Sequence, residues 1–184
     1  MNNLLILGAG GMGHMIQETA LQIGYDSVAF LDDAKKGKDI IGKCCDYENF
    51  LQSYDTAVAA FGDNNMRLRW TERLMEAGYQ VPAIVHPSAV VSPSAVIGRG
   101  SFVMHRAVVN TNTVIEHGVL VSSGAVIDHD SYIASGVNIG LGSIVKANCT
   151  IAAGVRVEAG DVIFSTRRTV SYTHLRAHET SAHL

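Results

Sequence analysis

The sequence predicts a small α/β domain followed by a parallel β-solenoid, and two observations support this fold class. Residues 1–80 alternate short apolar runs with helical stretches, which is typical of an α/β unit with a parallel sheet. From Val85 to Ile163 an aliphatic residue then recurs at every sixth position without a slip. A fixed period of this kind indicates a solenoid, in which each repeat buries its apolar side by stacking on its neighbours.

The first 80 residues carry strand and helix signals in alternation. The apolar run Leu4–Leu7 precedes a glycine cluster, and a helical pattern follows from about Met12 to Ile23. A helix that begins after the segment GDNN is expected to end at Gly78. The other expected elements are strands at Ser27–Leu31, near Cys44 and at Thr56–Phe61, and a helix at Tyr47–Tyr54.

The second half consists of six-residue repeats. The fourth residue after each aliphatic is mostly small, as at Ala89, Ser101 and Ala107. This pattern resembles the hexapeptide of left-handed parallel β-helices, in which three hexapeptides form one triangular coil and neighbouring coils lie about 4.8 Å apart. We assign residues 81–168 to such a β-helix of four to five coils. The repeated aliphatic residues are Val85, Val91, Ile97, Val103, Val109, Ile115, Val121, Ile127, Ile133, Ile139, Val145, Ile151, Val157 and Ile163.

The residue before each aliphatic should point outward, because successive strand residues face opposite sides. From Ile84 to Tyr132 all of these outward residues are apolar, which is more contiguous apolar surface than a monomer usually exposes. We therefore expect an oligomer; the alternative is that the N-terminal domain covers this surface. Asn138, Thr150 and Arg156 interrupt the column, so the later coils should be partly wet or should contact a polar ligand.

Charge and composition exclude several classes of function. The formal net charge is −3 and no block of like charges occurs, so nothing indicates binding to nucleic acid or to an anionic membrane surface. No apolar run approaches the roughly 18 residues that a membrane span needs. The three cysteines lack a CxxC spacing, and the N-terminus lacks the features of a signal peptide. These observations predict a cytoplasmic protein.

The C-terminal residues break every pattern that precedes them. The segment VSYTHLRAHET, from Val170 to Thr180, resembles one reading-frame translation of a transposase sequencing adapter. We therefore treat residues 169–184 as a foreign tail and expect that the natural C-terminus is lost.

A glycine cluster follows the first strand and opens the first helix. It comprises Gly8, Gly10, Gly11 and Gly13, and the acidic Asp32 lies 24 positions after Gly8. Glycines let the backbone approach a phosphate closely, and a helix N-terminus attracts an anion. Because about 80 residues have room for one mononucleotide-binding half, a nucleoside diphosphate fits better than a dinucleotide. The alternative is a glycine turn that serves only tight packing.

Five motifs, taken in order, resemble one enzyme family. Both halves together resemble the bacterial nucleotide-sugar acetyltransferases that act in bacillosamine synthesis and the related sialic acid O-acetyltransferases. The likeness covers roughly residues 3–163 and includes a Rossmann-like N-terminal domain. The motifs are GAGGMG at Gly8–Gly13, FLDD at Phe30–Asp33, FGDNNMR at Phe61–Arg67, IVHPSAVVSPSAVIG at Ile84–Gly98 and AVIDHD at Ala125–Asp130.

The resemblance implies roles for particular residues. It makes His129 the general base and Asp130 the residue that orients it. It places Asn138 at an acetyl-CoA-binding position, where many relatives have a second histidine near the thioester. It further implies acetyl-CoA as co-substrate and a homotrimer with active sites between subunits. The nucleotide sugar would be held by Gly8, Gly10, Gly11, Met12, Gly13, Asp32 and Asp33.

The pair His129 and Asp130 suits acyl transfer on chemical grounds. Moving an acetyl group from a thioester to an amine or hydroxyl needs a base, and imidazole has an unperturbed pKa of about 6.5. A neighbouring carboxylate fixes the tautomer and stabilises the imidazolium that forms. His129 follows the inward Ile127 by two residues, so it should project outward at a turn. The alternative is an ordinary surface histidine between two solvated aspartates.

A metal site on one subunit is not expected. His105, His117 and His129 are spaced by twelve residues, which is two thirds of a coil, so they should occupy three different corners. His86 and His105 lie nearly one coil apart and could be neighbours, but catalytic zinc usually has three protein ligands.

The sequence therefore predicts an acetyl-CoA-dependent acetyltransferase that acts on an amino or hydroxyl group of a nucleotide-linked sugar. Two alternatives stay open: a non-catalytic scaffold that binds sugar nucleotides, and an NAD-dependent oxidoreductase favoured by the glycine cluster with Asp32.

Overall fold

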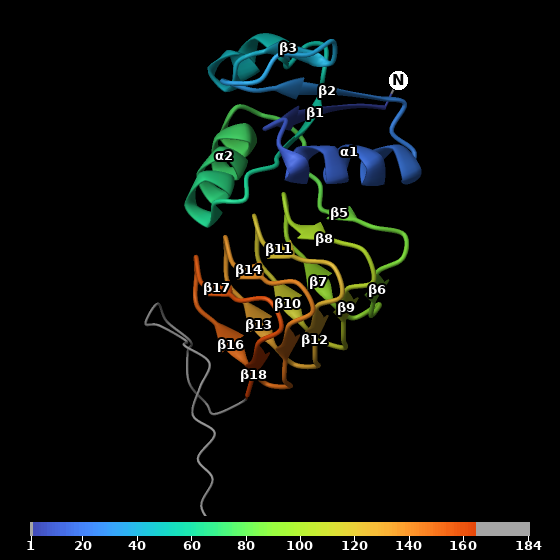
Figure 1. Cartoon of the computed structure of the whole chain (residues 1–184), viewed down its shortest axis with the longest axis vertical. Coiled ribbons are helices and arrows are strands. Elements are labelled where there is room, and N and C mark those ends of the chain that lie inside the picture. The colour runs from blue at the N-terminus through green and yellow to red at the C-terminus, as the bar shows by residue number, and fades with distance from the viewer. Residues whose placement is uncertain (1, 165–184) are drawn as a thin grey trace, which may run out of the picture.

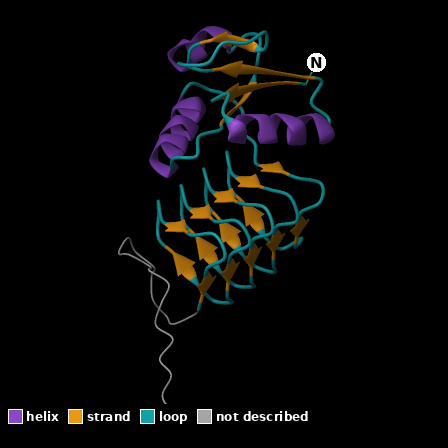
Figure 2. Cartoon of the chain, in the orientation of Figure 1, coloured by secondary structure: helices purple, strands orange, loops and turns teal. Residues whose placement is uncertain are grey.

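A four-stranded α/β domain stands on one face of a triangular β-helix in the computed structural model of the chain, which describes residues 2–164 (Figure 1). The foreign tail expected at residues 169–184 lies outside the described residues, as do residues 165–168. Figure 2 shows that the helices are confined to the upper domain and that short strands and turns make up the lower one. The chain thus changes architecture once, between α2 (Asn64–Glu76) and β5 (Ile84–Val85).

The upper domain has a parallel sheet with the strand order β3-β2-β1-β4. Its strands are β1 (Asn3–Leu7), β2 (Ser27–Leu31), β3 (Ile40–Gly42) and β4 (Thr56–Ala59), and α1 (Gly11–Gln22) connects the first two. The third strand lies at residues 40–42 rather than near Cys44, and the expected helix at 47–54 is a 3-10 helix, η1 (Cys44–Phe50). The backbone N–H of Cys44, the first residue of η1, donates to Asp33 Oδ1 at 2.9 Å, so this carboxylate caps the start of the 3-10 helix.

The sheet buries both of its faces, as a parallel sheet usually does. Alternate residues of β1 enter two separate clusters: Leu4 and Ile6 belong to one, and Leu5 and Leu7 to the other. The first cluster continues through α1 to Ile84 and Phe102 of the β-helix and forms one part of the contact between the domains. The second cluster lies on the other face of the sheet, which η1 and the end of α2 cover.

The β-helix has three faces made of two-residue parallel strands, and each strand pairs with the strand eighteen residues later. Face 1 contains β5, β8 (Phe102–Val103), β11 (Leu120–Val121), β14 (Asn138–Ile139) and β17 (Arg156–Val157). Face 2 contains β6 (Val90–Val91), β9 (Val108–Val109), β12 (Val126–Ile127), β15 (Ile144–Val145) and β18 (Val162–Ile163). Face 3 contains β7 (Val96–Ile97), β10 (Val114–Ile115), β13 (Tyr132–Ile133) and β16 (Thr150–Ile151).

The aliphatic residues of the six-residue repeat fill the interior of the β-helix, as predicted. From Val103 to Ile163 all of them are buried in one continuous cluster, and the three earlier ones, Val85, Val91 and Ile97, pack against it half-exposed. The first coil is open at its end, so its inward residues keep some contact with solvent. The predicted left-handed parallel β-helix is confirmed by this repeated pattern of strands.

The outward apolar residues divide among the three faces, and within residues 2–164 the upper domain covers those of face 1 alone. Ile84 and Phe102 on face 1 are fully buried under the upper domain. By contrast, the outward Val90 on face 2 is 63% exposed and Val96 on face 3 is 57% exposed. The interpretation that the N-terminal domain covers the outward surface is thus correct for one face, whereas outward apolar residues of the other two faces, such as Val90 and Val96, stay exposed in the described part of the chain.

A column of glycines on one corner lets α2 approach the β-helix closely. Each glycine of this corner has a positive φ, between 63° and 70°, and follows the previous one by eighteen residues. A Cβ on Gly100 would come within 2.6 Å of Thr71, and one on Gly136 within 3.1 Å of Leu68. Only glycine therefore satisfies both the left-handed turn and the helix contact. The column consists of Gly100, Gly118, Gly136 and Gly154.

Arg67 of α2 joins the two domains through a fully buried guanidinium. Burial is the main cause that lowers its pKa to about 10. Asn64, one turn earlier, donates its Nδ2 to Gly154 O at 3.0 Å, so α2 bonds to three successive coils. Arg67 donates to Gly118 O at 2.9 Å, Phe61 O at 3.0 Å, Asn64 Oδ1 at 3.0 Å, Gly136 O at 3.1 Å and Val137 O at 3.2 Å.

Replacing Arg67 should therefore loosen the contact between the domains. The substitution Arg67→Met keeps the aliphatic stem but leaves buried carbonyl groups without a donor, so we expect it to lower the free energy of unfolding by about 3 kcal/mol. Urea denaturation followed by circular dichroism measures this loss, and an unchanged midpoint would contradict the role given to the guanidinium.

Thr71, one turn further along α2, provides the matched control. Its side chain is also buried against the glycine corner, but its Oγ1 has no hydrogen-bond partner among the described residues. The substitution Thr71→Val removes only this unpaired hydroxyl, so its effect on stability should lie within about 0.5 kcal/mol or be favourable.

Candidate functional site

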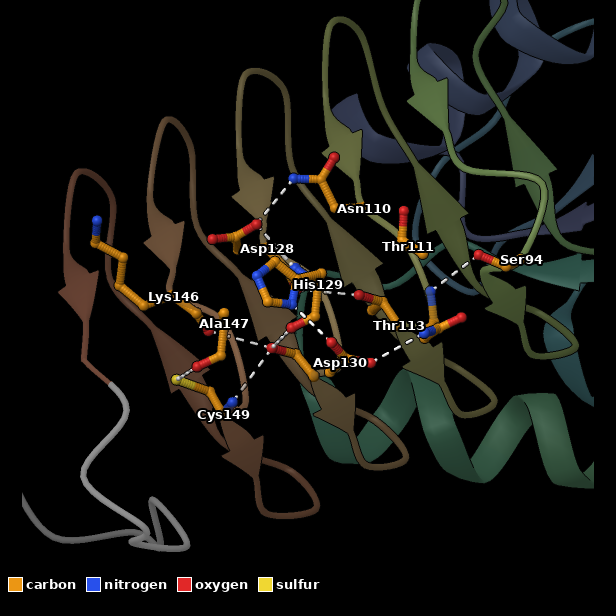
Figure 3. A network of polar contacts seen from close by, with 12 residues as sticks. Ser94, Asn110, Thr111, Thr113, Asp128, His129, Asp130, Lys146, Ala147 and Cys149 are labelled. Carbon is orange, nitrogen blue, oxygen red and sulfur yellow. Dashed lines mark hydrogen bonds and ion pairs between the residues drawn. The ribbon is translucent and has the colours of Figure 1, made fainter.

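His129 lies at the corner between face 2 and face 3, in the turn that joins β12 to β13 (Figure 3). Its side chain is 51% exposed and projects away from the interior, as the sequence predicts. The ring Nδ1 lies 2.7 Å from Asp130 Oδ2. Because the carboxylate can only accept, Nδ1 carries the proton and Nε2 is left free to take one.

Asparagines of the preceding coil hold both aspartates of this turn. Asn110 Nδ2 donates to Asp128 Oδ1 at 3.1 Å, and Asn112 Nδ2 donates to Asp130 Oδ1 at 3.0 Å (Figure 3 shows the first bond). Asp128 Oδ1 also accepts the backbone N–H of His129 at 2.9 Å. Sequence reasoning missed the two asparagines, although each precedes its aspartate by one coil of eighteen residues.

These contacts shift the pKa values in the directions that a base needs. The hydrogen bond to Asp130 raises the pKa of His129, and the same bond is the main cause that lowers the pKa of Asp130. The pKa of Asp128 is lowered, first by the backbone N–H of His129 and then by Asn110. Both aspartates thus stay ionised, and one of them is aligned with the imidazole.

The glycine turn, residues Gly8–Gly13, has two glycines that are tightly packed and two that border open space. Gly8 has a φ of 99°, and a Cβ on Gly13 would come within 2.0 Å of Gly8 O, so these two glycines are required by the fold. A Cβ on Gly10 or Gly11 would meet no atom within 4 Å. Met12 packs half-buried against the cluster between the domains. The first turn of α1 has no side-chain cap and no acidic residue, so its backbone N–H groups are available to a ligand.

The two predicted acids lie at different places. Asp32 accepts the backbone N–H of Ala9 at 2.7 Å and thereby braces the glycine turn. Its burial acts to raise its pKa, but hydrogen bonds from the backbone N–H groups of Lys35, Ala9 and Ala34 lower it overall. Asp33 instead accepts from the start of η1. The structure thus joins Asp32, but not Asp33, to the glycine turn through a hydrogen bond.

One chain does not bring the predicted catalytic and substrate-binding residues together. The glycine turn stands over face 1, and Asn138 is an outward residue of β14 on the same face. His129 occupies the corner between the other two faces, which is the corner opposite face 1. Within a single subunit, His129 and the glycine turn therefore lie on opposite sides of the β-helix.

The other histidines are arranged as the eighteen-residue coil requires. His105 lies between face 1 and face 2, His117 between face 3 and face 1, and His129 on the remaining corner. His86 and His105 are neighbours with stacked rings, whose centroids are 3.6 Å apart. In residues 2–164 no cluster of three or more potential ligands could hold a metal ion, and no helix of that part could cross a membrane.

An open groove of about 210 Å³ lies on face 3 near the end of α2, away from the predicted site residues. Met75, Val96 and Val114 line it together with Glu116 and His117. His117 Nε2 lies 3.8 Å from Glu72, so the polar end of the groove is occupied by contacts between α2 and the β-helix.

Comparison with known proteins supports the combination of these two domains. The family model of the PglD N-terminal domain matches residues 3–74. UDP-N-acetylbacillosamine N-acetyltransferase of Bacillus subtilis (strain 168) is 34% identical over 113 residues, which is 56% of this chain and 52% of that protein. The aligned part thus spans about half the length of this curated relative.

Two solved structures are similar over most of their length. The acetyltransferase domain of PglB from Neisseria gonorrhoeae FA1090, in complex with acetyl coenzyme A, has a TM-score of 0.79 and 33% identity and covers 88% of this chain and 92% of its own. PerB from Caulobacter crescentus, in complex with CoA and GDP-perosamine, has a TM-score of 0.78 and 26% identity and covers 89% of both chains. By its fold and by this similarity, the chain belongs to the family of bacterial nucleotide-sugar acetyltransferases.

Proposed function

We propose that the protein transfers the acetyl group of acetyl-CoA to an amino group of a nucleotide-linked sugar. The observation that carries this proposal is the exposed pair of His129 and Asp130, 2.7 Å apart, on a β-helix similar to one solved with acetyl coenzyme A. The curated relative from Bacillus subtilis is an N-acetyltransferase, which favours an amine over a hydroxyl as acceptor.

The geometry of the pair supports a single base. Nε2 of His129 takes a proton from the acceptor amine as the amine attacks the thioester carbonyl. Asp130 stabilises the imidazolium that forms, because its carboxylate accepts the Nδ1 proton. When the tetrahedral intermediate collapses, the carbon–sulfur bond breaks and the imidazolium returns the proton to the leaving thiolate. The products are the acetylated amine and CoA thiol.

The glycine turn supplies the nucleotide site in this proposal. Gly10 and Gly11 border open space, and the free N–H groups of Gly11, Met12 and Gly13 start α1. Asp32 supports the turn through Ala9, whereas Asp33 accepts from the start of η1. The sheet provides one mononucleotide-binding half, which gives an NAD-dependent oxidoreductase no further support.

A homotrimer with shared sites is the assembly that fits these positions. His129 lies opposite the glycine turn of its own subunit, so both can act on one substrate only across a contact between subunits. Faces 2 and 3 carry the exposed apolar residues that such a contact would bury. Asn138, on the side of the glycine turn, would then face the thioester of acetyl-CoA bound between subunits. The predicted cytoplasmic location remains a prediction.

The substitution His129→Ala should lower kcat/KM by about 10²- to 10⁴-fold, because it removes the general base. CoA thiol release from acetyl-CoA, measured with UDP- and GDP-linked amino sugars, reports the rate. His105→Ala, at another corner of the β-helix and in the preceding coil, is the matched control and should keep the wild-type rate. Equal turnover of the His129→Ala variant and the wild type would refute the role of His129 as general base. If the wild type bound its substrates but released no thiol, the non-catalytic scaffold would be favoured instead.

The pH dependence should reveal the contact with Asp130. Only the neutral imidazole can act as base, and its pKa is raised above 6.5, so kcat/KM should fall as the pH drops below this raised pKa. Asp130→Asn removes the carboxylate that raises the pKa, so the acid limb should move to lower pH. Asp128→Asn, which contacts only the backbone of His129, should move it less. If the acid limb lay at the same pH in the wild type and both variants, the contact with Asp130 would not set the pKa of the base.

Mixed oligomers test whether the site is shared. The variants His129→Ala and Gly11→Ile should each be inactive alone, the second because its side chain fills the open space beside the turn. Co-expressed subunits should regain activity, with about a quarter of the sites intact if assembly is random. If each site lay within one subunit, no activity would return.

A further inference from the structure

The outward column of face 1 changes from apolar to polar along the β-helix. In register, Phe102, Leu120, Asn138 and Arg156 lie on successive strands. Phe102 is buried and Leu120 packs half-buried, both in the cluster with α1. Asn138 and Arg156 therefore begin where this apolar contact between the domains ends.

Arg156 reaches from the β-helix to the loop that precedes α2. Its Nη2 donates to Gly62 O at 3.2 Å, and the rest of its exposed guanidinium makes no other hydrogen bond to the described residues. This loop lies beside the glycine turn, because Ala60 N donates to Leu7 O at 2.8 Å and the Phe61 ring lies 3.2 Å from the Cβ position of Gly8. Arg156 thus brings a cation of the β-helix to the loop bordering the glycine turn.

Positive charge at this junction is not neutralised by the described part of the chain. Burial is the first cause of the lowered pKa of Arg67, and the nearby charge of Arg156 is the second. Neither arginine forms a salt bridge with a carboxylate of residues 2–164. Asp63 acts in the opposite direction on Arg67, but its carboxylate caps α2 by accepting Met66 N at 2.7 Å. Two guanidinium groups therefore lie close together, and the acid that acts on Arg67 already caps α2.

Asn138 provides an independent sign of a ligand at this junction. It points outward from face 1 but is only 7% exposed, and it follows Gly136 and Val137, whose carbonyl groups accept from Arg67 of α2. Its Oδ1 accepts from Ser122 Oγ at 3.5 Å, and its Nδ2 donates to none of the described residues. A Cβ on Gly62 would meet no atom within 4 Å, as at Gly10 and Gly11, so there is room for a ligand beside both loops.

We propose that Arg156 binds the diphosphate of the nucleotide-linked sugar held by the glycine turn of the same subunit, next to the free amide of Asn138 on the adjacent strand. The inference rests on the proposed function and adds to it a residue of the β-helix that no motif indicates. A guanidinium suits this task because its planar donors match two phosphate oxygens at once. The N–H groups that begin α1 face the same anion from the other domain.

The diphosphate of CoA has the same chemistry, so the test must separate the two sources. Isothermal titration of the full chain with UDP, GDP and CoA measures each affinity. Arg156→Gln should weaken binding of the nucleoside diphosphate by about 10- to 100-fold and leave the affinity for CoA unchanged. It should also reduce the salt dependence of this binding, which a merely structural role would not do. Arg156→Lys should lie between Gln and the wild type.

Arg99→Gln is the matched control, because Arg99 is also an exposed arginine of the β-helix but borders the groove on face 3. This variant should keep the wild-type affinities. Unchanged affinity of Arg156→Gln for a diphosphate that the wild type binds would overturn the inference and leave the proposed function intact. Weaker binding of CoA alone would also overturn it. Failure of the wild type to bind UDP and GDP would overturn both.

Discussion

The eighteen-residue coil is the constraint on which every other feature of the β-helix depends. Each inward aliphatic packs on its counterparts one coil away, and a slip by one residue would turn it outward into water. The register of the core therefore decides which polar residues meet at the corners. It places Asn110 beside Asp128 and Asn112 beside Asp130, so the site around His129 is held by core packing as well as by its own hydrogen bonds.

The same register aligns the carbonyl groups that accept from Arg67. A buried guanidinium is costly unless its donors are satisfied, and here carbonyls of successive coils satisfy it in place of a carboxylate. Such bonds have a defined geometry, so α2 has one favourable position on the glycine corner. This fixes the glycine turn over face 1 and thereby separates it from His129 of the same chain.

The period of six was sufficient to predict the β-helix, its inward residues and the separate corners of His105, His117 and His129. This period did not show which outward residues the other domain covers, because outward residues six positions apart lie on faces 1, 2 and 3 in turn. When every eighteenth residue is compared instead, the outward residues of face 1 form one series, which changes from apolar residues to Asn138 and Arg156. The contact of Asp32 with Ala9 was beyond prediction, since it depends on how β1 and β2 end side by side.

The exposure of His129 matters for the chemistry that we propose. In the single chain the ring is half-exposed, and the hydrogen bond to Asp130 is the largest cause of its raised pKa, to which the charges of Asp128 and Asp130 add. A neighbouring subunit that covered the corner would oppose this shift, because burial disfavours the imidazolium. It would also exclude water from the thioester and strengthen the interaction with Asp130. A base that works near neutral pH thus follows from the balance of two opposing effects, of which a neighbouring subunit would strengthen the second.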